Sequence, residues 1–383
     1  MKSQPDLTIA PEKNTTAKIA YIDHLKVLCT ILVVLHHSFI TYGAPGGWYY
    51  QQKSVHMAAQ FPMTLFVATN QSFFMGFFFF LSALFVVPSY QKKGTAKFVT
   101  DRLKRLGIPL VFYSLILSPI LIYLVQRFGK GATYSFTEFL GGFHDWIDFG
   151  VLWFVAALLI FNLVYLLLQN ISWRFKFKWP SNIQLLLVGI LIGLASFVTR
   201  IWFPTGWTLQ PLGFQLGYFP QYIVFFIAGL IASNNKWLDQ LSLKQGKIMA
   251  RMAFVMVVIV LPAIFAAYLA VKFPIKNFNG GWNWVSLAYS LWEQLTGIMI
   301  SVALLCIAKF KWNDATTFSK KLSANAFAVY IFHPLVLISL ALLAQSWPIY
   351  PEFKLLIVGP AAVFGSFLFA ALIRKTKVVR DII

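Results

Sequence analysis

Long runs of Phe, Leu, Ile and Val recur along the whole chain, and about 20 apolar residues suffice for a helix to cross roughly 30 Å of hydrocarbon. Of the 383 residues, 59% are hydrophobic and 11% are charged, whereas a soluble domain carries roughly 25% charged residues. This deficit is too large for a water-facing surface. The sequence therefore predicts an all-α fold, a polytopic transmembrane helix bundle with most of its length in a lipid bilayer.

Ten segments are apolar and long enough to be spans. The second carries Asn70, Gln71 and Ser72 midway, so it is either one long helix or two pieces. We expect a polar cytoplasmic tail at 1–20, a transmembrane domain at 21–375 and a cytoplasmic tail at 376–383, with no secretory signal peptide. The ten predicted spans lie at 25–42, 62–88, 106–126, 150–168, 183–202, 217–233, 250–271, 285–308, 324–344 and 353–373.

The distribution of basic residues predicts the orientation. With the N-terminus in the cytoplasm, most of the 32 Lys and Arg residues fall on the cytoplasmic side, and the alternation holds at every turn, as the positive-inside rule requires. Both termini are therefore expected in the cytoplasm of a multi-pass protein of the plasma (inner) membrane. The net charge of +20 then has a membrane explanation, and nucleic-acid binding is not expected.

Ionisable residues gather in the first span. Lys26 and His37 are eleven residues apart, close to three helical turns, which puts them on one face about 16 Å apart. Asp23 shares that face, whereas His36 points about 100° away. Lys26 is expected at the cytoplasmic boundary and His37 near mid-membrane. An imidazole there either packs against a neighbouring helix or does acid–base work, because its ordinary pKa of about 6.5 allows proton transfer near neutral pH.

Two later spans also carry candidates. Glu293 lies clearly within a span, where it either orients a catalytic base, binds a hydroxyl or makes a structural hydrogen bond. His333 precedes Pro334, which loosens the helix ladder, and fits a packing or kink residue as well as a site residue. Cys29 and Cys306 are far apart in apolar segments, which favours two buried thiols over a disulfide or a metal site.

The segment after the second span is strongly basic. Arg102 and Arg105 are three residues apart on a short predicted helix that runs into Pro109. Arginine binds phosphate bidentately, so a phosphorylated cytosolic donor could bind here; a topology signal resting on anionic lipid is the alternative. On the outer side, His144 and Asp145 lie among aromatic residues, which fits either sugar binding or an interfacial aromatic belt.

Five short motifs occur at defined places along the chain. In the first span, Lys26 is followed by ten residues and then His37, and Arg102 and Arg105 form an Arg-x-x-Arg motif. The other three motifs are FFMGFFFFLSALF in the second span, LWFVAALLIF in the fourth and SANAFAVYIFHPL in the ninth. With the ten-span plan, these motifs resemble the acyltransferase-3 family of membrane-bound acyltransferases over nearly the whole chain. Within it, the pattern is similar to the glucan-modifying succinyltransferase branch, with Lys26 where arginine is common.

The resemblance implies an O-acyltransferase. An acetyl or succinyl group would pass from cytosolic acyl-CoA to a hydroxyl of an extracytoplasmic envelope carbohydrate, with His37 as base or acyl relay. Acyl-CoA would be the donor substrate, and no tightly bound cofactor or metal is expected. The candidate catalytic residues are His37 and Glu293, and the candidate donor- and substrate-binding residues are Lys26, Arg102, Arg105, Asp23 and His333.

A transporter or flippase without covalent chemistry is the alternative, because intramembrane His and Glu also mark proton-coupled carriers. Such carriers often show inverted repeats with interrupted helices in matching positions. The sequence shows no such halves, which favours the enzyme.

Overall fold

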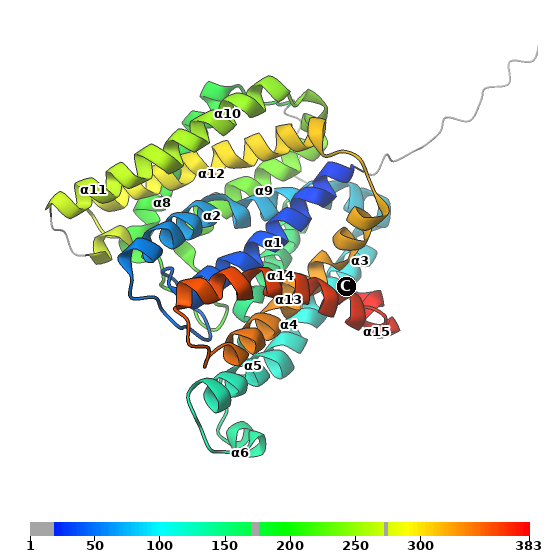
Figure 1. Ribbon diagram of the computed structural model, residues 1–383. Coiled ribbons are helices and arrows are strands. Elements are labelled where there is room, and N and C mark those ends of the chain that lie inside the picture. Colours follow the sequence, from blue (N-terminus) through cyan, green and yellow to red (C-terminus); the bar gives the residue numbers. More distant parts are fainter. Residues whose placement is uncertain (1–18, 170–175, 272–274) are drawn as a thin grey trace, which may run out of the picture.

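The computed structural model describes residues 19–169, 176–271 and 275–383, which form helices, turns and loops apart from one isolated β-bridge (Figure 1). Within these residues, ten helical segments are long and apolar enough to cross a membrane, which confirms the all-α bundle and the predicted number of spans. Residues 1–18 of the predicted polar tail lie outside the described residues. The ten spans are α1 (Ala20–Tyr42), α2 (Met57–Ala83), Val86–Gly129, Gly150–Leu168 with α7 (Trp153–Leu168), α8 (Asn182–Trp202), Leu216–Asn234 with α9 (Phe219–Asn234), Leu243–Val271, α12 (Trp284–Lys311), α13 (Thr317–Leu343) and α14 (Pro351–Ile373).

The third and seventh spans are composite. Pro109, Pro119 and Pro262 each lie two residues after a π-helical segment. Proline has no N–H to give the carbonyl four residues earlier, so the helix widens locally, as π-bulges do. The third span runs through α3 (Val86–Arg102), Leu103–Gly107, α4 (Ile108–Phe112), Tyr113–Leu117, α5 (Ser118–Leu124) and Val125–Gly129; the seventh runs through α10 (Leu243–Val255), Met256–Val260 and α11 (Leu261–Val271). The short helices α6 (Phe136–Gly141) and α15 (Lys377–Ile382) lie outside the spans.

The bundle has two ends, and hydrogen bonds join loops that were predicted to share a side. At the end where α1 begins, His24 Nδ1–H donates to the carbonyl of Trp312 at 2.5 Å. At the opposite end, Gln52 Nε2 donates to the carbonyl of Gln345 at 3.1 Å. This grouping is what ten alternating spans require. The cytoplasmic location of the α1-start end stays a prediction from charge.

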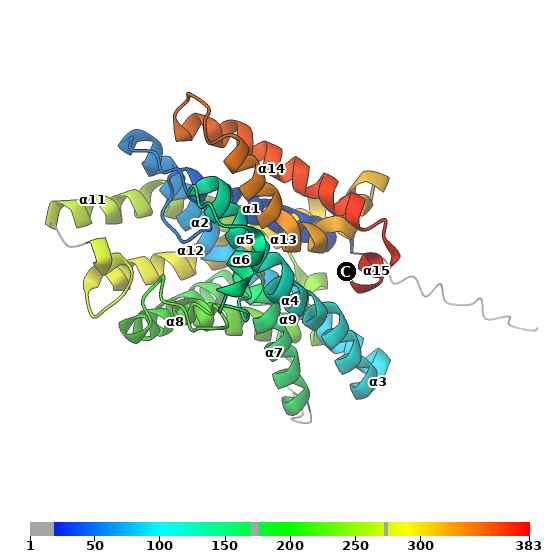
Figure 2. The same ribbon diagram turned by 90° about the horizontal axis from the view of Figure 1, so that it is seen from below.

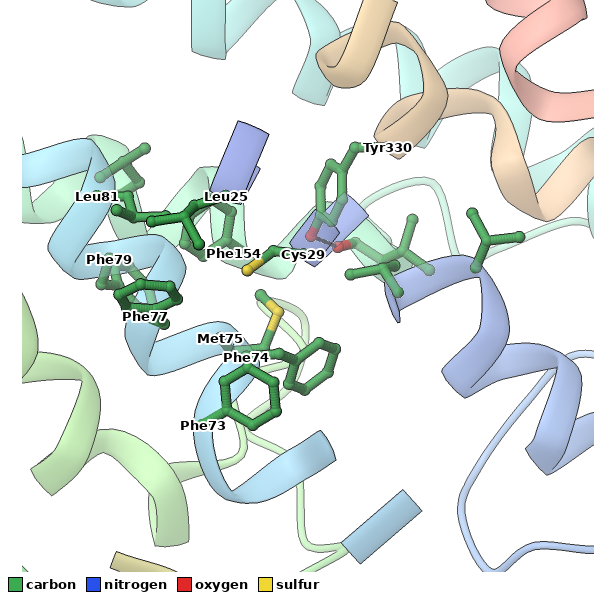
Figure 3. Packing of buried hydrophobic residues seen from close by; sticks show 14 of the residues in the cluster. Leu25, Cys29, Phe73, Phe74, Met75, Phe77, Phe79, Leu81, Phe154 and Tyr330 are labelled. Carbon is green, nitrogen blue, oxygen red and sulfur yellow. Dashed lines mark hydrogen bonds between the residues drawn. The ribbon is translucent and has the colours of Figure 1, made fainter. Parts of the chain in front are cut away.

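Helix α1 lies in the middle of the bundle and packs against α2, α12, α13 and α14 (Figures 1 and 2). Its apolar side chains share one buried cluster with the Phe-rich half of α2. Figure 3 shows Leu25 and Cys29 of α1 together with Phe74 and Met75 of α2. Cys29 and Cys306 are both buried and free, as predicted.

The second span is one continuous helix, which decides between the two sequence interpretations. Its polar middle is used for contacts between helices. Asn70 Nδ2 donates to the carbonyl of Leu32 on α1 at 3.2 Å, and Gln221 Nε2 of α9 donates to the carbonyl of Ser72 at 2.6 Å. Each bond satisfies a polar group that would be costly in lipid. The polar middle of α2 therefore binds α1 and α9, and it does not interrupt α2.

Candidate functional site

His37 lies in the last third of α1. The helix begins at Ala20, earlier than the predicted residue 25, and ends at Tyr42. At 1.5 Å per residue, His37 is about 26 Å from the helix start and about 8 Å from its end. The earlier start of α1 therefore puts His37 farther from the middle of the helix than the sequence predicted.

Three aromatic rings meet at His37. Its imidazole stacks on Trp48, with ring centroids 4.0 Å apart and planes 19° apart, and on His333, at 5.4 Å and 18°. The Trp48 and His333 centroids are 6.0 Å apart. Trp48 belongs to the 43–56 loop, which folds back over the end of α1, and His333 lies within α13. We call His37, Trp48 and His333 the three-ring cluster.

Each ring of the three-ring cluster has a buried nitrogen with no partner in the described residues: His37 Nδ1, Trp48 Nε1 and His333 Nε2. Buried polar atoms nearly always have a hydrogen-bond partner. His333 Nδ1 lies 2.8 Å from the carbonyl oxygen of Tyr330. Because a carbonyl only accepts, Nδ1 carries the proton, and Nε2 of the neutral ring is an acceptor. The cluster therefore presents polar atoms that other side chains leave free.

His36 is occupied differently. Its Nδ1 accepts a hydrogen bond from Asn70 Nδ2 at 3.2 Å, and its ring stacks on Phe74 at 5.0 Å. It faces α2, which agrees with the 100° offset from His37 read from the sequence. His36 thus packs α1 against α2, whereas His37 faces the 43–56 loop and α13.

One hydrogen bond joins the 43–56 loop to the third span, and another joins that span to the segment after it. The hydroxyls of Tyr49 and Tyr113 are 2.9 Å apart, and Ser118 Oγ donates to Asp148 Oδ2 at 2.6 Å. Burial raises the pKa of Tyr49, and the hydroxyl of this residue is therefore neutral. Gly150 has φ +44°, and a Cβ there would collide with the Tyr49 hydroxyl. These contacts fix the loop that carries Trp48.

The candidate residues of the outer loop before the fourth span are mostly exposed. His144, Asp145 and Trp146 are exposed. Asp148 is half-buried, and its carboxylate also accepts from the backbone N–H of Gly150 at 2.9 Å. Asp145, beside His144, therefore faces solvent, whereas Asp148 supports the fold around Tyr49.

The basic candidates lie toward the α1-start end. Lys26 Nζ lies 4.1 Å from the centroid of the Phe85 ring, and the Arg102 guanidinium lies 4.7 Å from that of Phe98. Phe85 precedes α3, and Phe98 lies in the second half of α3, after the glycine with φ +71° that interrupts the helix. Arg105 is exposed, and the helix does run on into Pro109, as predicted.

Lys26 of α1 thus contacts the junction of α2 and α3, whereas Arg102 packs on a ring of its own helix. Asp23 forms no salt bridge within the described part of the chain and is half-buried. Within those residues no group of three His, Cys, Asp or Glu side chains could hold a metal ion. The candidate residues of α1 are therefore split: Asp23 and Lys26 lie near its start, and His37 lies toward its end.

Glu293 forms a buried ion pair with Arg200 of α8. Arg200 also donates to the carbonyl of Gly217 and to Ser290 Oγ, each at 3.2 Å, and its guanidinium lies 4.9 Å from the Tyr218 ring. Gln294 Nε2 donates to the same Glu293 oxygen that pairs with Arg200, at 2.8 Å. The structure thus shows Glu293 bound to Arg200 on α8, and a catalytic role for it stays a prediction.

Sequence reasoning missed two of these residues. Arg200 follows an apolar run and is fully buried, although the sequence analysis did not single it out. A signal existed in Gly189 and Gly193, four residues apart, since this spacing lets helices approach closely; a Cβ at either would crowd Leu295 or Leu291 of α12. Trp48 gave no signal, because its position depends on how a loop folds.

The fold and site define a class: a polytopic membrane protein with cations at one end of its central helix and a buried histidine cluster toward the other. The family model described as an acyltransferase domain, that of the acyltransferase-3 family, matches residues 19–375. The chain belongs to this family and is a membrane acyltransferase. No curated protein and no solved structure matches the chain.

Proposed function

We propose that the chain transfers an acetyl or succinyl group from cytosolic acyl-CoA to a hydroxyl of an extracytoplasmic envelope carbohydrate in the plasma (inner) membrane. The observation that carries the proposal is the unpartnered buried Nδ1 of His37, on the same helix as Lys26 and eleven residues beyond it. The two positions are about 16 Å apart along the axis. A donor bound at one end of α1 could thus deliver its acyl group toward the other.

The charges support a phosphorylated donor at the α1-start end. CoA carries phosphates, for which exposed arginine is a suitable partner. Arg105 is exposed and Arg102 is half-buried over Phe98, so both side chains can be reached from the loop region. Lys26 lies half-buried deeper along α1, where it would meet the pantetheine arm and not the phosphates.

His37 would act in one of two ways. As a relay, a ring nitrogen attacks the thioester carbonyl, the C–N bond forms, the C–S bond breaks, and CoA leaves as a thiol after taking the proton lost by the imidazole. The acceptor oxygen then attacks the acyl-imidazole, the C–N bond breaks, and the hydroxyl proton passes to the released imidazole nitrogen. As a base, His37 takes the proton of the acceptor hydroxyl while the hydroxyl oxygen attacks the thioester carbonyl directly; the C–S bond breaks, and the departing thiolate takes that proton from His37. Both routes need an imidazole nitrogen without a fixed partner, and His37 has one.

The test measures acyl transfer from labelled acetyl-CoA and succinyl-CoA, supplied in turn, to envelope glycan in proteoliposomes. Removing a catalytic base or nucleophile costs at least about 100-fold, so His37→Ala should lose transfer by that factor or more. The matched control is His36→Gln, which changes the neighbouring buried histidine that packs on α2. Full activity in His37→Ala would refute the catalytic role.

Mass spectrometry of envelope glycans with and without the gene identifies donor group and acceptor together. A mass increase specific to one glycan is expected. Solute flux across the membrane without any acylated product would instead favour a transporter.

A further inference from the structure

We infer that Trp48 and His333 bind the acceptor hydroxyl: Trp48 Nε1–H donates to its oxygen, and His333 Nε2 accepts its proton. This inference rests on the proposed acyl transfer and names the acceptor half of that site. It gives His333 a role in acceptor binding, where the sequence had placed it among donor- and substrate-binding candidates. It also gives a role to Trp48, which the sequence did not single out.

Trp48 and His333 carry two unsatisfied groups that complement each other. Indole Nε1 can only donate, and His333 Nε2 can only accept, because Tyr330 holds the proton on Nδ1 at 2.8 Å. Both atoms are buried without a partner in the described residues, and their rings are 6.0 Å apart between centroids. One donor and one acceptor in the same buried cluster call for a ligand that can accept and donate at a single atom.

The two nitrogens also define the chemical class of the ligand. A hydroxyl has one donor and two lone pairs, so it satisfies both ring nitrogens at once. An ammonium group has no lone pair for the Trp48 N–H, and a carboxylate has no proton for His333 Nε2. The buried, uncharged surroundings of His333, which has no exposed surface, also disfavour a charged group. The site therefore selects an alcohol, and the product is an ester.

The position of the bound hydroxyl also fits acyl transfer. The same two rings contact His37, at 4.0 and 5.4 Å between centroids, so a hydroxyl between them lies next to the imidazole that carries or awaits the acyl group. His333 Nε2 takes the hydroxyl proton as the oxygen forms its bond to the acyl carbon. On the relay route this carbon is bound to a nitrogen of His37, and that C–N bond breaks at the same stage. The proton on His333 then passes to the leaving nitrogen of His37, so charge and atoms balance.

The experiment separates donor from acceptor steps. Trp48→Phe keeps an aromatic ring against His37 and removes the N–H; His333→Gln keeps a neutral polar side chain and removes the base. Two quantities are measured for each variant: the Kd of the purified protein for acetyl-CoA and succinyl-CoA, and ester content of envelope glycan in cells that express it in place of the wild type. The matched control is Trp292→Phe, which deletes a buried indole donor, bound to the carbonyl of Met256 at 2.7 Å, away from the cluster.

We expect the donor Kd to stay within about twofold in both variants. Glycan ester should fall about tenfold in Trp48→Phe, for the loss of one hydrogen bond, and at least about 100-fold in His333→Gln, for the loss of a base. Trp292→Phe should match the wild type when values are compared at equal amounts of folded protein. Mild alkali should release the acyl groups from the wild-type product, as it does with esters.

Several results would overturn the inference. Unchanged glycan ester in both variants would show that the two nitrogens only bind a structural water. A donor Kd weakened together with transfer would move the residues to the donor step, and alkali-stable acyl groups would identify an amine acceptor. If the wild type itself neither binds acyl-CoA nor esterifies glycan, the proposed function fails first, and that outcome is distinct from the others.

Discussion

The buried pair of Arg200 and Glu293 makes a quantitative prediction about stability. Both side chains have at most 1% of their surface exposed, and Arg200 is further held by Gly217 and Ser290. Replacing Arg200 by methionine removes the positive charge and most of the donors. Glu293 then keeps a single hydrogen bond, from Gln294 Nε2.

The expected cost follows from the uncompensated charge. Removing one partner of a buried ion pair destabilises a protein by about 3–5 kcal/mol, or roughly two to four powers of ten in the unfolding equilibrium constant. Arg200→Met should therefore lower the free energy of unfolding by that amount. The double variant Arg200→Met/Glu293→Gln removes both charges, so most of the loss should be recovered.

The assay is equilibrium unfolding in mixed micelles with rising dodecyl sulfate, followed by tryptophan fluorescence, for wild type, both single variants and the double variant. The double-mutant cycle isolates the interaction between the two side chains. If the losses of Arg200→Met and Glu293→Gln simply add in the double variant, the pair contributes no coupling and the reasoning is refuted. Acyl transfer by Glu293→Gln per folded molecule then separates a catalytic role of Glu293 from its structural one.

Three further predictions concern packing, donor binding and orientation. Gly229→Val should destabilise the α2–α9 contact, measured in the same unfolding assay, because even a Cβ there would approach the carbonyl of Phe80 to 2.5 Å; an unchanged midpoint would contradict it. Arg102→Ala should raise the Kd for acyl-CoA about tenfold with little effect on folding, measured by equilibrium binding, and an unchanged Kd argues for a topology signal only. Single cysteines at the exposed positions His144 and Lys321 should react with impermeant maleimide from outside and from inside the cell, respectively; reaction of both from one side would disprove the ten-span alternation.

The sequence predicts the helices well because spans are recognised from local composition. All ten predicted spans overlap the observed ones, and the short predicted helix that carries Arg102 and Arg105 does run on into Pro109. The errors lie at the ends: α1 begins at Ala20, before the apolar run, because its first turns pack inside the protein and do not meet lipid. Apolar length alone does not register such a turn.

The site is harder to predict because it depends on contacts between distant segments. His37 and His333 were each named from the sequence, but their stacking follows from α1 packing on α13, nearly 300 residues later. The pairing of Arg200 with Glu293 likewise depends on the approach of α8 to α12. The position of Trp48 depends on a loop whose conformation is set by Tyr49, Tyr113 and their neighbours.

The central place of α1 has a consequence for the assembly of the protein in the cell. Helix α1 is synthesised first, yet two of its four main neighbours, α13 and α14, are the last spans to leave the ribosome. Until then His37 lacks α13, whose His333 stacks on it, and an ionisable group that meets lipid is costly. Loss of the C-terminal helices would therefore leave the α13–α14 face of α1, with His37, uncovered however well the first eight spans had folded.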